Sequence, residues 1–135
     1  MSLNYHHDKL KNIGWLTRAF IVAVWFASGF FCKVLDMVPR HRQIVGRFLG
    51  DEHALLMTRT IGFFEIMMVV WILSRLFPRV CATSQILLVI TMNVMEVVWT
   101  ADLLLFGRWN LIPGSLFILV VWADQWQLNI KSCDK

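Results

Sequence analysis

Two carboxylic acids within long apolar stretches of the 135-residue sequence are its strongest candidates for chemistry. Glu65 lies near the middle of one stretch, and Glu96 lies near the end of the next. An ionisable group in hydrocarbon costs roughly 2.5–3.5 kcal/mol on insertion scales, so each needs either a partner or a function. A carboxylate held in a membrane can bind a polar headgroup or relay protons. Both residues are therefore candidates for a ligand-binding or proton-relay site.

The polar residues near these acids suggest how they are arranged. Asn93 precedes Glu96 by three positions, so the two share a helical face. At about 1.5 Å per residue, Arg59 and Glu96 each lie about 6 Å from the same end of two antiparallel helices, which predicts an ion pair. Glu65 lies about 15 Å from that end. It is also about 120° around the helix from Arg59, so it has no evident partner.

Two interpretations of these groups stay open. In the first they are structural: they neutralise one another, hydrogen-bond across helices and fix the register of a bundle, while Gly62 lets two backbones approach. In the second, Glu65 and Glu96 line a polar cavity in one half of the membrane. Lys33, Arg59, Asn93 and Asn110 fall within the same half and would belong to that site.

The elements that carry these residues are long apolar helices. The sequence is 58% hydrophobic and 16% charged, against about 45–50% and about 25% in soluble domains. A membrane-spanning helix needs about 20 mostly apolar residues. Four stretches meet this requirement, at about 13–35, 55–77, 80–100 and 103–126. We therefore expect an all-α membrane protein, a bundle of four transmembrane helices that forms a single integral membrane domain over residues 1–135.

Two features qualify this bundle. In the segment 36–54, apolar residues recur at helical spacing between basic ones, which is typical of a short amphipathic helix in the membrane interface between the first two spans. Within the last span, Asn110 and the Pro113–Gly114 pair predict a local break, because proline removes a backbone hydrogen bond.

The orientation in the membrane can be estimated from the basic residues. Lys and Arg number seven on the side of both termini and five on the other, which favours cytoplasmic termini.

Several function classes are disfavoured. The net charge of +4 is scattered over segment ends and forms no patch for nucleic acid. All four histidines lie outside the expected spans, so this chain alone should not hold a membrane haem, and we expect no metal site. Cys32 is expected on the opposite side of the membrane from Cys81 and Cys133, too far for a disulfide.

Several segments together resemble the DoxX-like family. They are Gly29 to Asp36, Pro39 to His41, Ile44 to Arg47, Ile61 to Glu65, Asn93 to Glu96 and Asn110 to Pro113. The resemblance covers about residues 13 to 125 in length, helix count and order of motifs. It implies a four-helix membrane subunit in which the residues of interest are Lys33, His41, Arg47, Glu65 and Glu96.

The resemblance also implies a function. Some family members belong to quinone-linked oxidoreductases, so the chain is expected to bind a quinone or a lipid as a subunit of a membrane redox complex. Since it has no redox cysteine pair, any redox role needs a bound quinone or a partner subunit. A small proton-coupled transporter and a non-catalytic assembly subunit are the alternatives. The expected setting is a bacterial inner membrane, with lipid and either a redox partner or further copies of the chain as contacts.

Overall fold

All regular structure in the described part of the chain is helical, as expected. The computed structural model describes residues 2–99, 102, 109 and 111–133. In chain order the elements are α1 (Ser2–Phe26), the π-helix η1 (Ala27–Val34), α2 (Pro39–Leu49), α3 (Asp51–Ser74), α4 (Pro78–Trp99) and α5 (Leu111–Cys133).

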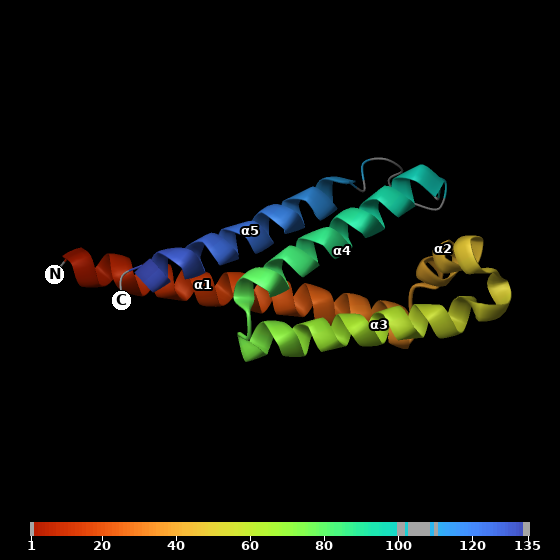
Figure 1. Cartoon of the computed structure of the whole chain (residues 1–135), viewed down its shortest axis with the longest axis horizontal. Coiled ribbons are helices and arrows are strands. Elements are labelled where there is room, and N and C mark those ends of the chain that lie inside the picture. Colours follow the sequence, from red (N-terminus) through yellow and green to blue (C-terminus); the bar gives the residue numbers. More distant parts are fainter. Residues whose placement is uncertain (1, 100–101, 103–108, 110, 134–135) are drawn as a thin grey trace.

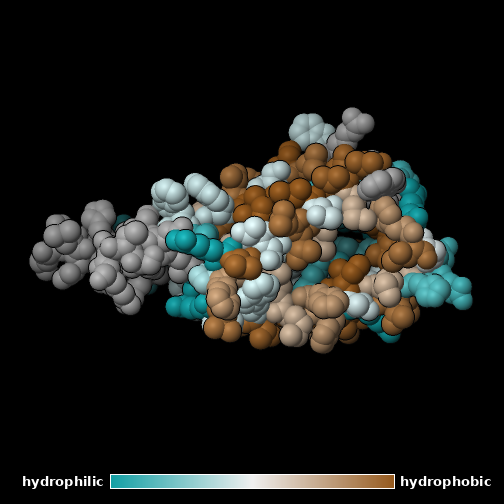
Figure 2. Space-filling view, viewed as in Figure 1, coloured by the Kyte–Doolittle hydropathy of each residue, from teal (hydrophilic) through white to brown (hydrophobic). Residues whose placement is uncertain are grey.

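The surface of these helices is suited to lipid rather than water. Three segments, Asn12–Val34, Asp51–Ser74 and Pro78–Val98, are long and apolar enough to cross a membrane. Large apolar side chains point outward along them; Phe64, for example, is 66% exposed. Figure 2 shows apolar residues over most of the helical surface and hydrophilic residues toward its two ends. Because a water-soluble chain rarely exposes so large an apolar area, we identify an integral membrane protein.

The helices form two antiparallel layers (Figure 1). α3 runs back along α1 and η1, while α4 and α5 pack against each other as a second pair. α5 also contacts α1, which joins the two layers. α2 packs on α3 and η1 at one end of the molecule, and the two chain termini lie at the opposite end. Toward the α2 end, the α4–α5 pair diverges from α3 (Figure 1).

The first long helix begins earlier than the expected 13–35 and changes type before it ends. α1 starts at Ser2, and its last two turns widen into η1. The amide of Leu35 donates to the carbonyl of Phe30, five residues back, at 3.0 Å, which is the π-helical pattern. Asp36 then adopts a left-handed conformation with φ 51° and ends the helix.

A helix forms in the segment between the first two long helices, as the amphipathic pattern predicts. α2 spans Pro39–Leu49 and is followed by Gly50 at φ 86° and ψ 150°, a conformation open essentially only to glycine. This sharp reversal folds α2 back against α3, where Gly46 lies against Asp51 and Ala54. α3 begins directly after the reversal, four residues before the expected start at 55, and acidic residues in its first turn favour that start.

The last long helix is continuous through Pro113–Gly114, so the break expected there is not seen among the described residues. α5 begins at Leu111, so Pro113 lies in its first turn, where the missing amide hydrogen has no intrahelical partner to lose. The helix then continues to Cys133, beyond the expected end at 126. Most of residues 100–110, including Asn110, lie outside the described residues.

The packed core fills only the half of the molecule near the termini. Its buried residues are Ile21 and Trp25 of α1, Met68, Val69 and Ile72 of α3, Cys81 and Ala82 of α4, and Val121 of α5. Trp25 adds a polar link inside this core, since its indole Nε1 donates to Gln85 Oε1 at 2.9 Å. The half nearer α2 is built differently, around a close contact between two helices and a cavity.

The close contact depends on two glycines. A Cβ atom on Gly62 would lie 2.7 Å from the carbonyl oxygen of Gly29, and one on Gly29 would lie 2.7 Å from the carbonyl oxygen of Gly62. Real Cβ atoms do not approach backbone oxygen so closely, so η1 and α3 touch backbone to backbone. Small residues allow such contacts between helices in membranes.

Replacing Gly62 with alanine should therefore destabilise the protein. The added methyl would force η1 and α3 apart, at a cost of about 1–3 kcal/mol typical of overpacking. Thermal unfolding in detergent would measure the change, with Ala27→Leu as a control that adds more atoms at an exposed position of η1. An unchanged melting temperature for Gly62→Ala would show that the contact is not as tight as described.

Candidate functional site

A cavity of about 610 Å³ lies in the half of the molecule nearer α2. Its walls come from α1, η1, α2, α3, α4 and α5, and most are apolar or aromatic, with Phe20, Trp25, Phe48 and Phe117 among them. The surface is hollowed between α3 and α4, and hydrophilic residues lie inside the hollow (Figure 2). The cavity is thus an apolar space that holds a small set of polar groups.

Five of the residues singled out in the sequence line this cavity. They are Lys33, His41, Glu65, Asn93 and Glu96. Ser28 and Thr58 add hydroxyl groups to the lining. Polar residues from four different helical elements therefore meet in one place, although they are widely separated in the sequence.

Lys33 and Glu65 form a buried ion pair at the wall of the cavity. The Nζ atom of Lys33 donates to Oε1 of Glu65, and the residues are only 6% and 3% exposed. Lys33 also donates to Oγ of Ser28 at 3.0 Å. Ser28 precedes Lys33 by five residues, so the π-helical turn of η1 brings both onto the same side. The ammonium group is thus held by two partners.

The expectation that Glu65 has no partner is therefore wrong. It assumed that the ends of the first two long helices are level. In the structure Gly62 packs beside Lys33, so the first turns of α3 extend past the end of η1 and lie against α2. Glu65 is consequently level with the last turn of η1. The same offset leaves Ala54, Thr58, Gly62 and Glu65 buried along one face of α3.

The expected ion pair between Arg59 and Glu96 does not form. Arg59 is exposed on α3 and does not line the cavity. None of the four ion pairs among the described residues joins it to Glu96. The sequence estimate compared only how far the two residues lie from the ends of their helices. It did not include the separation of the helices, and α4 diverges from α3 toward this end (Figure 1).

Asn93 links the cavity to the start of α5. Its Nδ2 atom donates to the carbonyl of Val89 at 2.8 Å, within its own helix. A Cβ atom on Gly114 would lie 2.4–2.7 Å from the atoms of the Asn93 amide, so the amide packs directly on the α5 backbone. The small residue after Pro113 is thus required by packing rather than by a helix break.

His41 is the contribution of α2 to the cavity. Burial, together with the positive charges of Lys33 and Arg40, lowers the pKa of His41 to about 4 from its ordinary 6.5. Its amide donates to the carbonyl of Val38, while Nδ1 of the ring is buried without a hydrogen-bond partner among the described residues. The imidazole is therefore neutral at pH 7.

The other two predicted site residues lie elsewhere. Arg47, on the exposed face of α2, makes a two-point ion pair with Asp102 at 2.6 and 2.8 Å. Hydrogen bonding to Arg47 lowers the pKa of the Asp102 carboxyl. This pair ties α2 to the connection between α4 and α5 and does not contact the cavity. Asn110 lies outside the described residues.

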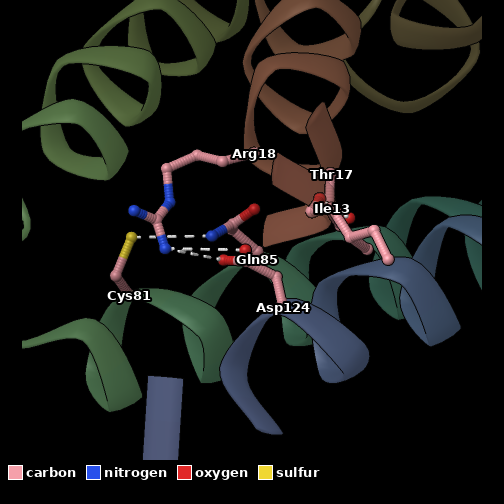
Figure 3. A network of polar contacts seen from close by, with 6 residues as sticks. All are labelled: Ile13, Thr17, Arg18, Cys81, Gln85 and Asp124. Atoms are coloured by element: carbon pink, nitrogen blue, oxygen red, sulfur yellow. Dashed lines mark hydrogen bonds and ion pairs between the residues drawn. The ribbon is translucent and has the colours of Figure 1, made fainter. Parts of the chain in front are cut away.

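Sequence reasoning missed a second polar network at the terminal end of the molecule (Figure 3). Arg18 of α1 pairs with Asp124 of α5 at 3.4 Å, and Gln85 of α4 donates to the sulfur of Cys81 at 3.6 Å. Both partners of the pair are charged residues within apolar stretches, which is the signal that could have identified them. Since the carboxylate is matched by a guanidinium and Gln85 by Trp25, this network is a structural one.

No metal centre is found in the part of the chain that the structure describes. Among those residues, no group of three or more His, Cys, Asp or Glu side chains is placed to hold an ion. Cys32 and Cys81 are both free thiols, at the two different ends of the helical layers. The chemistry available at the cavity is therefore that of the ion pair, the neutral imidazole, the amide and the second carboxylate.

Removing one partner of the Lys33–Glu65 pair should lower the free energy of unfolding more than removing both partners. Either Lys33→Met or Glu65→Gln alone leaves an unmatched buried group and should destabilise the protein by about 3–5 kcal/mol, whereas the double variant Lys33→Met/Glu65→Leu should cost much less. Unfolding in detergent would measure all three. Arg47→Met, which breaks an exposed pair, serves as the control and should change little. If the destabilisation of the double variant equalled the sum of the two single destabilisations, the two side chains would not be coupled.

Stability should fall as the pH decreases from about 6.5 to about 4. In this range the unfolded chain protonates His41 while the folded protein holds it neutral, so protons favour the unfolded state. His41→Gln should flatten the dependence of the melting temperature on pH. His53→Gln, at an exposed position of α3, should keep the wild-type slope. Identical slopes for His41→Gln and wild type would argue against a buried neutral imidazole.

Comparison with known proteins identifies the family. A family model described as the DoxX-like family matches residues 22–123, which include α3 and α4 and most of the cavity lining. No curated protein and no solved structure matches the chain. The resemblance noted in the sequence is thus confirmed by a match over most of its length. The chain belongs to the DoxX-like family of proteins.

Proposed function

We propose that this protein binds a small apolar molecule of the lipid or quinone class in its cavity, with the polar group of that molecule near Lys33 and Glu65. The observation that carries the proposal is the apolar space of about 610 Å³ with a buried ion pair in its wall. Ligand sites typically enclose about 300–1,000 Å³ and combine apolar walls with a few convergent polar groups. The cavity fits that description in both size and lining.

The position of the cavity supports a ligand that arrives through the membrane. The hollow opens between α3 and α4, two helices that carry exposed apolar side chains such as Phe63 and Leu87 (Figure 2). An apolar molecule dissolved in the bilayer could enter sideways without crossing water. Glu65 and Lys33 would then meet its polar group, while the aromatic walls contact its ring or chain.

A bundle of four spans completes this proposal. The apolar run of α5 packs along α4 and would form the fourth crossing beside the three helices that qualify by length and composition. An even number of crossings agrees with the two termini at one end of the molecule (Figure 1). Basic residues at that end favour cytoplasmic termini, and α2 at the other end would lie in the membrane interface. The setting we propose is a bacterial inner membrane.

A redox role, if the protein has one, rests on its ligand or its partners. The described residues supply no electron-carrying group, so a bound quinone or a partner subunit would provide that chemistry, and the chain would act as a subunit of a quinone-linked oxidoreductase. The alternative of proton-coupled transport would use a membrane carboxylate as its coupling site. The pairing of Glu65 with Lys33 favours binding over that alternative. An assembly subunit without a ligand is the other alternative, and the experiment below distinguishes it.

Mass spectrometry of protein extracted with its native lipid shell tests the proposal. We expect one molecule of a quinone or a specific lipid per chain in the wild type. Val24→Phe, which fills the cavity from α1, should lose this molecule, while Ala23→Phe, at the neighbouring exposed position, should keep it. Bulk lipid alone in the wild type, or equal retention by both variants, would overturn the proposal. A stoichiometric partner protein with no small molecule would instead support the assembly subunit.

A further inference from the structure

The two oxygens of the Glu65 carboxylate have different surroundings. Oε1 accepts from the Lys33 ammonium, whereas Oε2 is buried without a hydrogen-bond partner among the described residues. Glu65 as a whole is 3% exposed and lines the cavity. Buried polar atoms without partners are uncommon in folded proteins, because such an atom loses its hydrogen bonds to water and gains none in return. The carboxylate therefore has a buried acceptor without a partner, in a side chain that lines an apolar space.

The chemistry of this acceptor restricts what could complete it. An ionised carboxylate only accepts hydrogen bonds, so its partner must be a donor. A ketone or quinone carbonyl and a phosphodiester offer acceptors only, and they would leave Oε2 without a partner. A hydroxyl group offers a donor. A hydrogen bond to a charged group is also stronger than one between neutral groups.

The charges around the cavity act in the same direction. Lys33 matches one carboxylate, and Glu96 brings a second to the lining. His41 adds no positive charge at pH 7, because its pKa is lowered to about 4. Arg40 adds a positive charge near His41, so the two positive and two negative side chains in or beside the lining leave no net positive charge to favour an anionic headgroup. A neutral group that donates a hydrogen bond suits it better.

The walls indicate what carries the hydroxyl group. Aromatic side chains from three helices line the cavity, and Trp25 and Phe117 meet edge to face with ring centroids 6.0 Å apart. Such surfaces pack well against a further aromatic ring. An aromatic ring that bears a hydroxyl group would satisfy the walls and the free carboxylate oxygen together.

We propose that the cavity selects an aromatic hydroxyl, of the phenol or hydroquinone class, whose O–H donates to Oε2 of Glu65. This inference rests on the proposed function, since it names the polar group of the ligand bound there. It means that the reduced, hydroxyl-bearing form of a quinone-type molecule binds better than the oxidised form, which has carbonyl groups only.

A matched pair of probes tests the inference on the wild-type protein. 4-Nonylphenol carries the hydroxyl donor, and 4-nonylanisole keeps the ring and the chain but replaces the donor with a methyl ether. Equilibrium dialysis against purified protein in detergent would give both dissociation constants, and quenching of tryptophan fluorescence would report occupancy. We expect the phenol to bind at least about tenfold more tightly, as one hydrogen bond to a charged acceptor predicts.

Variants assign that preference to Glu65. Lys33→Met/Glu65→Leu removes the pair without leaving a buried charge and should bring the two probes to near equality. Glu52→Gln removes an exposed carboxylate from the first turn of α3 and should preserve the preference. A preference that persists in the double variant would overturn the assignment to Glu65.

The outcomes separate this inference from the proposal beneath it. Equal and saturable binding of both probes to the wild type would overturn the hydroxyl inference while leaving an apolar ligand site in place. Tighter binding of the ether would do the same. Binding of neither probe, together with no co-purifying small molecule, would overturn the site itself and the inference with it.

Discussion

The close contact of η1 with α3 is the constraint on which the rest of this half of the molecule depends. Because Gly29 and Gly62 carry no side chains, the two backbones touch, and Lys33 and Glu65 come within bonding distance of each other. Their charges could not be buried singly at an acceptable cost, so the contact and the ion pair require one another. The π-helical turn also places the hydroxyl oxygen of Ser28 beside the Lys33 ammonium group, which donates a hydrogen bond to it. The close backbone contact thus determines which charged side chains meet at the cavity wall.

Much of the fold follows from composition and periodicity. Long apolar stretches predict the helices, and the amphipathic pattern of residues 36–54 predicts α2, because both signals are local. Most of the polar cavity lining could also be foreseen, since a Glu or Asn in a membrane stretch is conspicuous. The offset between the ends of η1 and α3 could not. It depends on where the Gly50 reversal places α2 and on a backbone contact between distant residues, and neither has a local signature. Arg59 was included for its charge and Arg47 for the family resemblance, and both are exposed.

Two polar systems in the same bundle have different characters. At the terminal end Arg18 pairs with Asp124 (Figure 3), and Trp25 donates to Gln85, so these four side chains are matched within the protein. At the cavity, by contrast, one oxygen of Glu65 and one ring nitrogen of His41 stay without partners among the described residues. Buried polar groups that are satisfied fix a structure, whereas those left over cost stability. Gln127 Oε1 near the end of α5 is also buried without a partner among the described residues, but it does not line the cavity, whereas Glu65 and His41 do and could be completed by a bound ligand.

The division into a packed half and a hollow half also has a mechanical consequence. Side chains from four helices interlock near the termini, so relative displacement of those helices there would disrupt many contacts at once. Around the cavity the exposed Arg47–Asp102 pair links α2 to the connection between α4 and α5, but the packed apolar core does not extend there. Local opening needs less free energy where few apolar contacts are lost. The α4–α5 pair would then rotate as a unit about the packed terminal half, toward or away from α2 and α3. Breathing of this kind would change the width of the opening without unfolding any helix.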